Sequence, residues 1–476
     1  MLDFIILNLL ERDHNSVNMS SILFKNVDIL VRLKKATFKT IYGGFLGISD
    51  NRIVYIGQKK PKEKFDIEKN YKGKLLIPGL INAHGHAPMT LLRGVGSGKK
   101  LQDWLFNTIF PIEAKMIPSD IGVGADLASL EMIASGTTCV SEMYDFPYNS
   151  AVSFAKAGIR ANLTRTGLCD DSNCDISSWP RFIQMTDFAN VLAGKDVDDP
   201  EIEKQLGDKK IPQILAQSIK KDLIRGDLSV HAIYTTTPNF VKGVADINRD
   251  NKYIIQVHVS ETKKEVDDSL NEYKMTPIEY YHFHGLLDGG YCYFAHCVHA
   301  TDHDLDIMAK TNTSLVTNPS SNMKLASGFA PIRKALDKGV NVAIGTDGCA
   351  SNNNLDMFEE MHVLALIQSG ISNDPTVLKP DEIFEMATVG GAKAMHREEI
   401  GELKVGYKAD IVAIDLDKPH LIPNNDTVSL LVYSAHGSDV CMTMVDGKIL
   451  YEDGKFKTLD YDLIKKEVDQ VVKKLL

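Results

Sequence analysis

The chain has 476 residues, of which 44% are hydrophobic, and a formal net charge of -10 at pH 7. This length can bury a large core and is compatible with one oversized domain plus a smaller one. The acidic balance argues against a nucleic-acid surface, because phosphate binding needs a basic stripe. The seven cysteines are scattered and include no C-x-x-C pair, which argues against a disulfide framework and favours a reducing compartment.

The first ten residues, M-L-D-F-I-I-L-N-L-L, resemble a signal sequence only briefly. They carry Asp3 where a basic region would be expected, and no small-residue cleavage site follows. No other apolar run approaches the roughly 20 residues that a membrane span needs. We therefore expect a cytoplasmic protein with no membrane partner, and we assign no function to an N-terminal extension of residues 1–18.

Short strands separated by tight turns are predicted near both ends of the chain. The turns are marked by Ser49-Asp50-Asn51 and by Asp446-Gly447. We expect residues 19–77 and 397–476 to form the two parts of one small β-sandwich domain. The strand-like stretches are Ile22 to Arg32, Phe45 to Gln58, Lys408 to Asp415 and Val440 to Leu450.

Between the two ends, eight short apolar segments alternate with amphipathic segments of helical length. This pattern predicts an α/β fold in which residues 78–396 form a TIM-type (β/α)8 barrel with insertions. The predicted strands lie near Leu80 to His86, Thr137 to Met143, Ile159 to Thr166, Leu228 to Tyr234, Tyr253 to Val259, Tyr291 to His296, Ser314 to Thr317 and Asn341 to Thr346.

Metal-binding residue types stand where several of these strands end. His84 and His86 form a His-x-His pair whose side chains project from one face of a strand. His258, His296 and Asp347 each close a later apolar run. In this kind of barrel the carboxyl ends of the strands carry the catalytic groups, and imidazole with carboxylate suits zinc or a similar divalent ion. The sequence therefore predicts a catalytic metal site.

With these residues the chain resembles the amidohydrolase superfamily, and the resemblance covers nearly all of it. Within that superfamily, longer motifs resemble the methylthioadenosine and S-adenosylhomocysteine deaminase branch. The same branch is similar to triazine chlorohydrolases and aminohydrolases. The motifs are H-A-P-M-T-L-L-R-G, D-W-L-F-N-T-I-F-P-I-E-A-K, H-V-S-E-T, N-P-S-S-N-M-K-L-A-S-G and G-T-D-G-C-A-S-N-N-N-L-D-M-F.

The resemblance implies that His84, His86, His258 and Asp347 bind the metal. Binuclear relatives carry a bridging lysine at the end of the fourth strand, whereas this strand reads L-S-V-H-A-I-Y-T-T-T. We therefore expect one divalent ion, Zn2+ first and Fe2+ as the alternative.

It also implies the catalytic groups. Asp347 would accept the proton of the attacking water, and His296 would donate a hydrogen bond to the growing tetrahedral centre. Glu261 would protonate the ring nitrogen and later pass a proton to the departing ammonia. The simpler alternative for Glu261 is a solvated loop carboxylate.

Three further residues resemble substrate contacts, in addition to Glu261 and Asp347. Glu113 would bind the ribose hydroxyls, and His231 and Arg165 would contact other parts of the substrate. The simpler alternatives are a helix-surface charge, a core histidine and an internal ion pair, respectively. The chain departs from the family pattern between Asp170 and Gly226, where Arg181 is a weak candidate for the arginine that receives a homocysteine carboxylate.

The expected activity is metal-dependent hydrolytic deamination of adenosine-type nucleosides by an aminohydrolase (EC 3.5.4), with inosine-type products and ammonia. The alternative is a sister amidohydrolase acting on guanine, a pterin or an s-triazine. A non-catalytic scaffold is a more remote alternative, since every ligand position is filled. The resemblance also implies a homo-oligomer.

Overall fold

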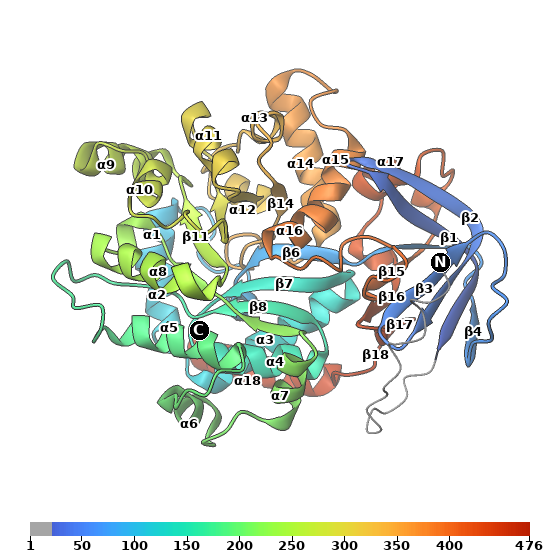
Figure 1. The fold of residues 1–476 in the computed structure, drawn as a ribbon, viewed down its shortest axis with the longest axis horizontal. Coiled ribbons are helices and arrows are strands. Elements are labelled where there is room, and N and C mark those ends of the chain that lie inside the picture. The colour runs from blue at the N-terminus through green and yellow to red at the C-terminus, as the bar shows by residue number, and fades with distance from the viewer. Residues whose placement is uncertain (1–20) are drawn as a thin grey trace, which may run out of the picture.

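The computed structural model describes residues 21–476, so the expected extension of residues 1–18 lies outside the described residues. Figure 1 shows a β-rich part, which contains the first strands together with strands from the end of the chain, beside a larger part in which helices surround strands. The α/β character predicted from the sequence is confirmed.

Nine strands from the two ends of the chain form one sheet, in the order β18-β17-β16-β15-β5-β1-β2-β3, with β4 paired to β1. The two ends join where β15 pairs antiparallel with β5. The strands are β1 (Ile22–Lys34), β2 (Thr37–Ser49), β3 (Arg52–Gly57), β4 (Ile67–Asn70), β5 (Lys74–Pro78), β15 (Ile411–Asp415), β16 (Val440–Val445), β17 (Lys448–Glu452) and β18 (Lys455–Phe456).

The expected two-sheet sandwich is supported only in part, because this ladder of hydrogen bonds is continuous. β1 pairs with β2 along one edge, and along the other edge it pairs with β4 through Ile22–Lys25 and with β5 through Asp28–Ile29. The register of β1 against β2 shifts between Lys25 and Ile29, and such bulges bend a strand. One long, irregular strand thus connects what the sequence assigned to separate sheets.

Strands occur at all eight positions predicted for the barrel, and their pairings are parallel. They are arranged as a four-stranded sheet, β6-β7-β8-β9, and a five-stranded sheet, β10-β11-β12-β13-β14. Their bounds are β6 (Leu80–Gly85), β7 (Thr137–Met143), β8 (Arg160–Thr164), β9 (Ile224–Gly226), β10 (Leu228–Val230), β11 (Ile255–Val259), β12 (Cys292–His296), β13 (Ser314–Thr317) and β14 (Val342–Ile344).

The expected barrel is supported only in part, because the strand ladder is interrupted at two seams. At the first seam, the predicted fourth strand begins as β10 at Leu228, and an additional short strand, β9, precedes it and is separated from it by Asp227. The Asp227 backbone N–H donates to the Leu163 carbonyl at 2.7 Å, whereas the next N–H, of Leu228, donates to the Ile254 carbonyl at 2.9 Å. The chain therefore changes partner sheets within one residue, which interrupts the regular pairing.

The second seam lies between β14 and β6, where single contacts replace strand pairing. The Asp347 backbone N–H donates to the His84 carbonyl at 3.0 Å. The Asn82 side chain accepts from the Thr346 backbone at 2.9 Å and donates to the Thr346 hydroxyl at 2.7 Å. These contacts hold the end of β6 beside the end of β14, so the predicted metal ligands of both segments meet.

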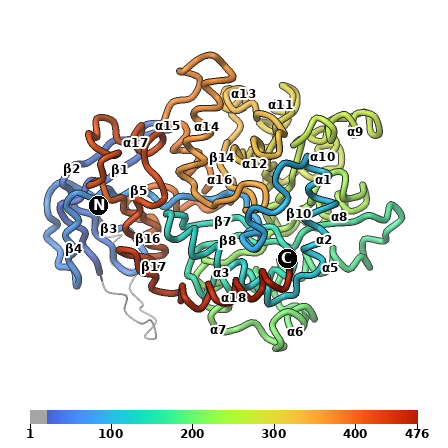
Figure 2. Tube along the Cα trace, turned by 180° about the vertical axis from the view of Figure 1, so that it is seen from behind, coloured from blue at the N-terminus to red at the C-terminus, as the bar shows by residue number. Residues whose placement is uncertain are grey.

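Helices surround the parallel strands, and the last helix returns to the first half of the chain. Figure 2 shows α18 beside α3, where Lys474 and Asp120 form an ion pair of 2.7 Å. Within residues 21–476, no helix is both long enough and apolar enough to cross a membrane. The helices are α1 (Leu101–Trp104), α2 (Phe110–Glu113), α3 (Pro118–Ala134), α4 (Pro147–Ala157), α5 (Pro180–Leu192), α6 (Pro200–Leu206), α7 (Gln213–Lys220), α8 (Pro238–Asn251), α9 (Lys263–Tyr273), α10 (Pro277–Phe283), α11 (Asp302–Lys310), α12 (Pro319–Lys324), α13 (Ile332–Asp337), α14 (Met357–Ser372), α15 (Pro380–Glu385), α16 (Gly391–Ala394), α17 (Thr427–Tyr433) and α18 (Tyr461–Leu475).

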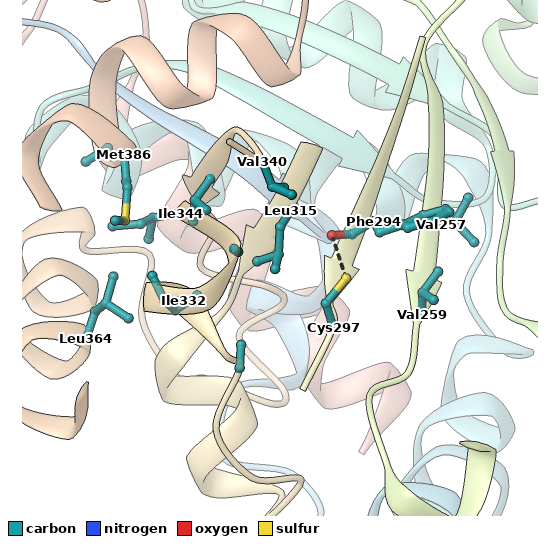
Figure 3. Packing of buried hydrophobic residues seen from close by; sticks show 14 of the residues in the cluster. Val257, Val259, Phe294, Cys297, Leu315, Ile332, Val340, Ile344, Leu364 and Met386 are labelled. Carbon is teal, nitrogen blue, oxygen red and sulfur yellow. Dashed lines mark hydrogen bonds between the residues drawn. The ribbon is translucent and has the colours of Figure 1, made fainter. Parts of the chain in front are cut away.

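The largest apolar cluster contains residues of the five-stranded sheet and its helices (Figure 3), and it extends to β1, β5, β15 and β16 of the nine-stranded sheet. Val257 and Val259 of β11 belong to this cluster, together with Phe294 of β12 and Leu315 of β13. Because side chains alternate across a strand, His258 points to the opposite side of β11 from its two valine neighbours. The packing of the valines therefore fixes the direction of a predicted metal ligand.

Candidate active site

Residues at the carboxyl ends of the parallel strands surround one cavity of about 290 Å3. Its wall includes most of the residues predicted from the sequence: His86, Glu113, His231, His258, Glu261, His296 and Asp347. His84 is fully buried behind this wall, and Arg165 does not line the cavity. The strand ends thus bring together side chains that are up to about 260 positions apart in the sequence.

The four predicted metal ligands converge on one point of the cavity. His86 Nε2 lies 3.2 Å from His258 Nε2 and 3.2 Å from Asp347 Oδ1. His84 Nε2 lies 3.7 Å from the same carboxylate oxygen. The candidate ligand atoms of His84, His86 and His258 all lie within 4.8 Å of one another. This combination of imidazole nitrogens and a carboxylate oxygen is typical of divalent transition-metal sites.

Backbone carbonyls orient two of the imidazole rings. His86 Nδ1 lies 2.7 Å from the Met143 carbonyl, and His258 Nδ1 lies 2.8 Å from the His231 carbonyl. A carbonyl oxygen only accepts, so we assign the hydrogen to each Nδ1 and the free lone pair to each Nε2. Two such lone pairs 3.2 Å apart repel each other unless a cation lies between them. This donor set fits a metal ion.

His84 supports the same conclusion from its own surroundings. Its side chain is fully buried, and neither ring nitrogen has a hydrogen-bond partner. Burying a polar group without a partner is unfavourable, and a metal ion would satisfy one of these nitrogens. Burial also lowers the pKa of His84 and of His258 well below the ordinary value, which keeps both rings neutral as ligation requires.

Hydrogen bonds on the far side of the Asp347 carboxylate hold it toward the histidines. The hydroxyls of Ser321 and Ser351 donate to Oδ2 at 2.6 and 2.9 Å, and the Gly348 backbone N–H donates to Oδ1 at 2.9 Å. Asp347 itself has a φ of 61°, a left-handed conformation that is uncommon for residues other than glycine. Such strain concentrates at functional sites.

Glu261 and His296 lie next to each other on the cavity wall, with His296 Nε2 3.8 Å from Glu261 Oε2. The His296 ring is oriented from behind by two amides, because its Nδ1 lies 2.8 Å from Asn322 Oδ1 and 3.3 Å from Asn318 Nδ2. Burial raises the pKa of the Glu261 carboxyl above its ordinary value. A carboxyl that stays protonated at higher pH is suited to donate a proton.

The loop that carries Glu261 is held by a second, buried carboxylate. Glu265, in the first turn of α9, accepts backbone N–H bonds from Ser260 at 2.7 Å and from Glu261 at 2.8 Å. Burial raises the pKa of Glu265 to about 7. Ser260 has a φ of 50°, so these two hydrogen bonds stabilise a sharp turn at the end of β11. Glu265 was not predicted as a site residue.

The two other residues expected to contact substrate on this side, Glu113 and His231, also line the cavity. The Tyr144 hydroxyl donates to Glu113 Oε1, and burial raises the pKa of Glu113 to about 7. His231 Nδ1 lies 2.8 Å from the Thr235 hydroxyl, and burial lowers the pKa of His231 to about 3. A neutral His231 with Nε2 free could accept or donate one hydrogen bond.

Arg165 lies behind the cavity wall, whereas Arg181 is part of the wall. Arg165 is buried, with NH1 3.5 Å from Glu201 Oε2 and Nε 3.9 Å from Asp145 Oδ1. Arg181 lines the cavity and donates to both Asp145 oxygens, at 2.6 and 2.9 Å. The internal ion pair, which was the simpler alternative for Arg165, is the arrangement observed.

The rest of the wall is largely apolar, and much of it comes from the segment between β6 and β7. This segment includes the π-helical turn Leu105–Ile109 between α1 and α2. Tyr144 and Asp145, directly after β7, were not predicted as site residues, although polar side chains after a buried strand were the signal that identified the other candidates. The apolar lining includes Leu101, Trp104, Leu105, Phe110, Met116 and Leu325.

Comparison with known proteins agrees with this geometry. Residues 75–450 match the model of the Amidohydrolase family. A 5-methylthioadenosine/S-adenosylhomocysteine deaminase of Acetivibrio thermocellus is 39% identical over 460 residues, which cover 96% of this chain and 100% of the relative. A 5'-deoxyadenosine deaminase of Methanosarcina mazei is 38% identical over 462 residues, covering 96% and 99%.

A solved structure shares the fold. The adenosine deaminase of Xanthomonas campestris, solved with bound zinc, has a TM-score of 0.81 and 29% identity, and the match covers 95% of this chain and 98% of that one. The family resemblance inferred from the motifs is confirmed: the chain belongs to the amidohydrolase family. Among the relatives found, those with the highest identity are named as deaminases of adenosine-type nucleosides.

Proposed function

We propose that this protein is a metal-dependent hydrolase that removes the 6-amino group of adenosine-type nucleosides as ammonia. The observation that carries the proposal is that a metal-type cluster, the acid Glu261 and the carboxylate Glu113 all face one cavity. The names of the full-length relatives support the same substrate class.

His84, His86, His258 and Asp347 would hold one divalent ion, which when bound lowers the pKa of water toward neutrality. Zinc is our first choice, since a solved relative contains it, and iron(II) is the alternative. Metal analysis of the purified protein identifies the bound metal and measures the number of metal ions per chain. One equivalent per chain is expected, and two would contradict the single site.

Asp347 would accept the proton of the attacking water, and this role is supported by its Oδ1, which faces the histidines, while its Oδ2 is held by two serines. His296 Nε2 faces Glu261 across the same part of the wall, and there His296, carrying a hydrogen on both ring nitrogens, would donate a hydrogen bond to the oxygen added at the ring carbon. Glu261, with its raised pKa, would protonate the adjacent ring nitrogen and then transfer a proton to the leaving ammonia.

Glu113 would bind the ribose through its two vicinal hydroxyls, and His231 would contact the nucleoside beside it. Arg181, rather than Arg165, is the arginine on the substrate side of the wall.

We further propose that the two parallel sheets work as one (β/α)8 barrel formed by residues 78–396. The protein would act as a homo-oligomer in the cytoplasm, where its seven unpaired cysteines remain reduced.

Ammonia release from metal-loaded protein tests the proposal. The panel comprises adenosine, 5'-deoxyadenosine, methylthioadenosine, S-adenosylhomocysteine, guanine and an aminotriazine. Turnover of the adenosines is expected. Activity confined to guanine or the aminotriazine would contradict the ribose role of Glu113 and move the protein to a sister activity of the same family.

A further inference from the structure

The part of the cavity wall formed by Asp145 and Arg181 has a charge arrangement that the proposed reaction does not use. Asp145 lies two residues beyond β7, and Arg181 lies in the first turn of α5. Both side chains are about one third exposed, and the guanidinium donates to both carboxylate oxygens at 2.6 and 2.9 Å. A bidentate pair of this kind is among the stronger ion pairs.

Carboxylates near this pair balance the positive charge of Arg181 and of its neighbour, Arg165. Behind the wall, the second guanidinium, of Arg165, lies 3.9 Å from Asp145 and 3.5 Å from Glu201. Lys204 also binds Glu201, at 2.9 Å, but it is more than half exposed to solvent. Two arginines thus share two carboxylates. Although burial opposes it, the bond to Asp145 raises the pKa of Arg181, so the pair stays charged and closed.

The remainder of the cavity offers little to an anionic group. Among the residues in the described part of the chain that line it, Arg181 has the only guanidinium or ammonium group. Glu113, Glu261 and Asp347 contribute carboxyl groups. The volume of about 290 Å3 is near the lower end of the roughly 300–1,000 Å3 that is typical of small-molecule sites. The site is therefore small, largely apolar and acidic.

We propose that Asp145 is a specificity-determining residue: it occupies Arg181, and the site thereby selects nucleosides with a short, uncharged 5' group over those with an amino-acid tail. This inference rests on the proposed function. A substrate carboxylate could take the two N–H groups that Arg181 donates to Asp145 only by displacing that side chain, which would lose two charge-assisted hydrogen bonds, and a carboxylate bound at any other N–H of Arg181 would lie beside the Asp145 anion. 5'-Deoxyadenosine and methylthioadenosine carry no carboxylate, so they can bind without displacing Asp145.

The substitution Asp145→Asn tests this selection, because it removes one charge while keeping the shape of the side chain. We measure kcat/KM for 5'-deoxyadenosine and for S-adenosylhomocysteine in the zinc-loaded wild type and variant. The wild type is expected to prefer 5'-deoxyadenosine. In the variant, the ratio of S-adenosylhomocysteine to 5'-deoxyadenosine activity should rise about tenfold, the typical effect of one charge-assisted hydrogen bond.

Two further variants show whether the freed arginine causes the change. Adding Arg181→Gln to Asp145→Asn should abolish the rise in the ratio. Asp175→Asn, at an exposed position between β8 and α5, changes the net charge equally and should leave the ratio at its wild-type value. A rise with Asp175→Asn would assign the effect to overall charge and overturn the proposal.

The remaining outcomes are also decisive. An unchanged ratio in Asp145→Asn would overturn the proposal, and so would a fall, which would mean that Asp145 binds the ammonium group of the amino-acid tail. If the metal-loaded wild type deaminates neither of these two nucleosides nor adenosine or methylthioadenosine, the proposed function itself fails. A folded wild type that turns over 5'-deoxyadenosine separates the two cases.

Discussion

The two ends of the cavity are built differently, and the difference separates chemistry from substrate choice. At the metal end, His258, His296 and Asp347 are buried at the ends of parallel strands and are oriented by backbone carbonyls, amides and serine hydroxyls. At the far end, Trp104, Arg181 and their neighbours come from short helices and from the segment after β8. Strands position the reactive groups, whereas loops shape what fits beside them.

The largest effect is expected from removing a ligand at the metal end. His258→Ala should lose the bound metal and essentially all activity, because a catalytic site with too few protein ligands does not retain the ion. Metal analysis and ammonia release on the same sample check this. Full metal content in an inactive variant would contradict the role of His258 as a ligand.

Glu261→Gln should lower kcat by about 10^2- to 10^4-fold while the metal remains bound, because only the proton donor is removed. Glu272→Gln, at an exposed glutamate on α9, is the matched control and should retain wild-type activity.

The raised pKa of Glu261 also predicts a pH dependence. Activity requires the protonated acid, so the activity should fall as pH rises through that pKa. This alkaline limb should be absent from the residual activity of Glu261→Gln.

At the substrate end, Glu113→Gln should act mainly on ribosides. The loss of charge-assisted bonds to the ribose predicts about a 10- to 100-fold fall in kcat/KM for 5'-deoxyadenosine. Tyr144→Phe, which removes the neighbouring hydroxyl but leaves the carboxylate, should have a smaller effect. Equal losses for adenine and for its riboside would contradict ribose binding by Glu113.

Glu265 is expected to be a positioning residue, which holds the loop that carries Glu261 and does not contact the substrate. In Glu265→Gln, one of the two backbone bonds at Ser260 and Glu261 is lost, so kcat should fall about tenfold with little change in KM. A purely structural role would lower thermal stability and leave the pH profile of the remaining activity unchanged. A shift in the alkaline limb of that profile is the expected signature of positioning.

The smallest predicted effect concerns stability rather than activity. Burial raises the pKa of Asp227 to about 7, although Gln256 and Asn162 donate to its carboxylate. The folded state then holds a proton that the unfolded state releases near pH 4, so stability should fall as pH rises from about 4 to 7. Asp227→Asn should reduce the difference between melting temperatures at the two pH values. Identical differences in both proteins would contradict this origin.

The histidines and the aspartate that lie together at one end of the cavity could be located from the sequence, because strand ends have a simple signature. An apolar run followed by His or Asp locates the residue, and the alternation of side chains gives its direction, as Val257 and Val259 do for His258. The β6–β14 seam and the division at Asp227 could not be predicted, because they depend on which backbone group finds a partner across the fold. The position of Arg165 behind the wall could not be predicted for a similar reason. Nothing local to either arginine reveals where Asp145 and Glu201 lie.

The most direct test of the account is ammonia release from 5'-deoxyadenosine by zinc-loaded wild type and Glu261→Gln at matched metal content. The account predicts sustained turnover by the wild type and a loss of at least about 10^2-fold in the variant. No ammonia from the wild type with this or any other adenosine nucleoside, or equal rates for both proteins, would contradict it.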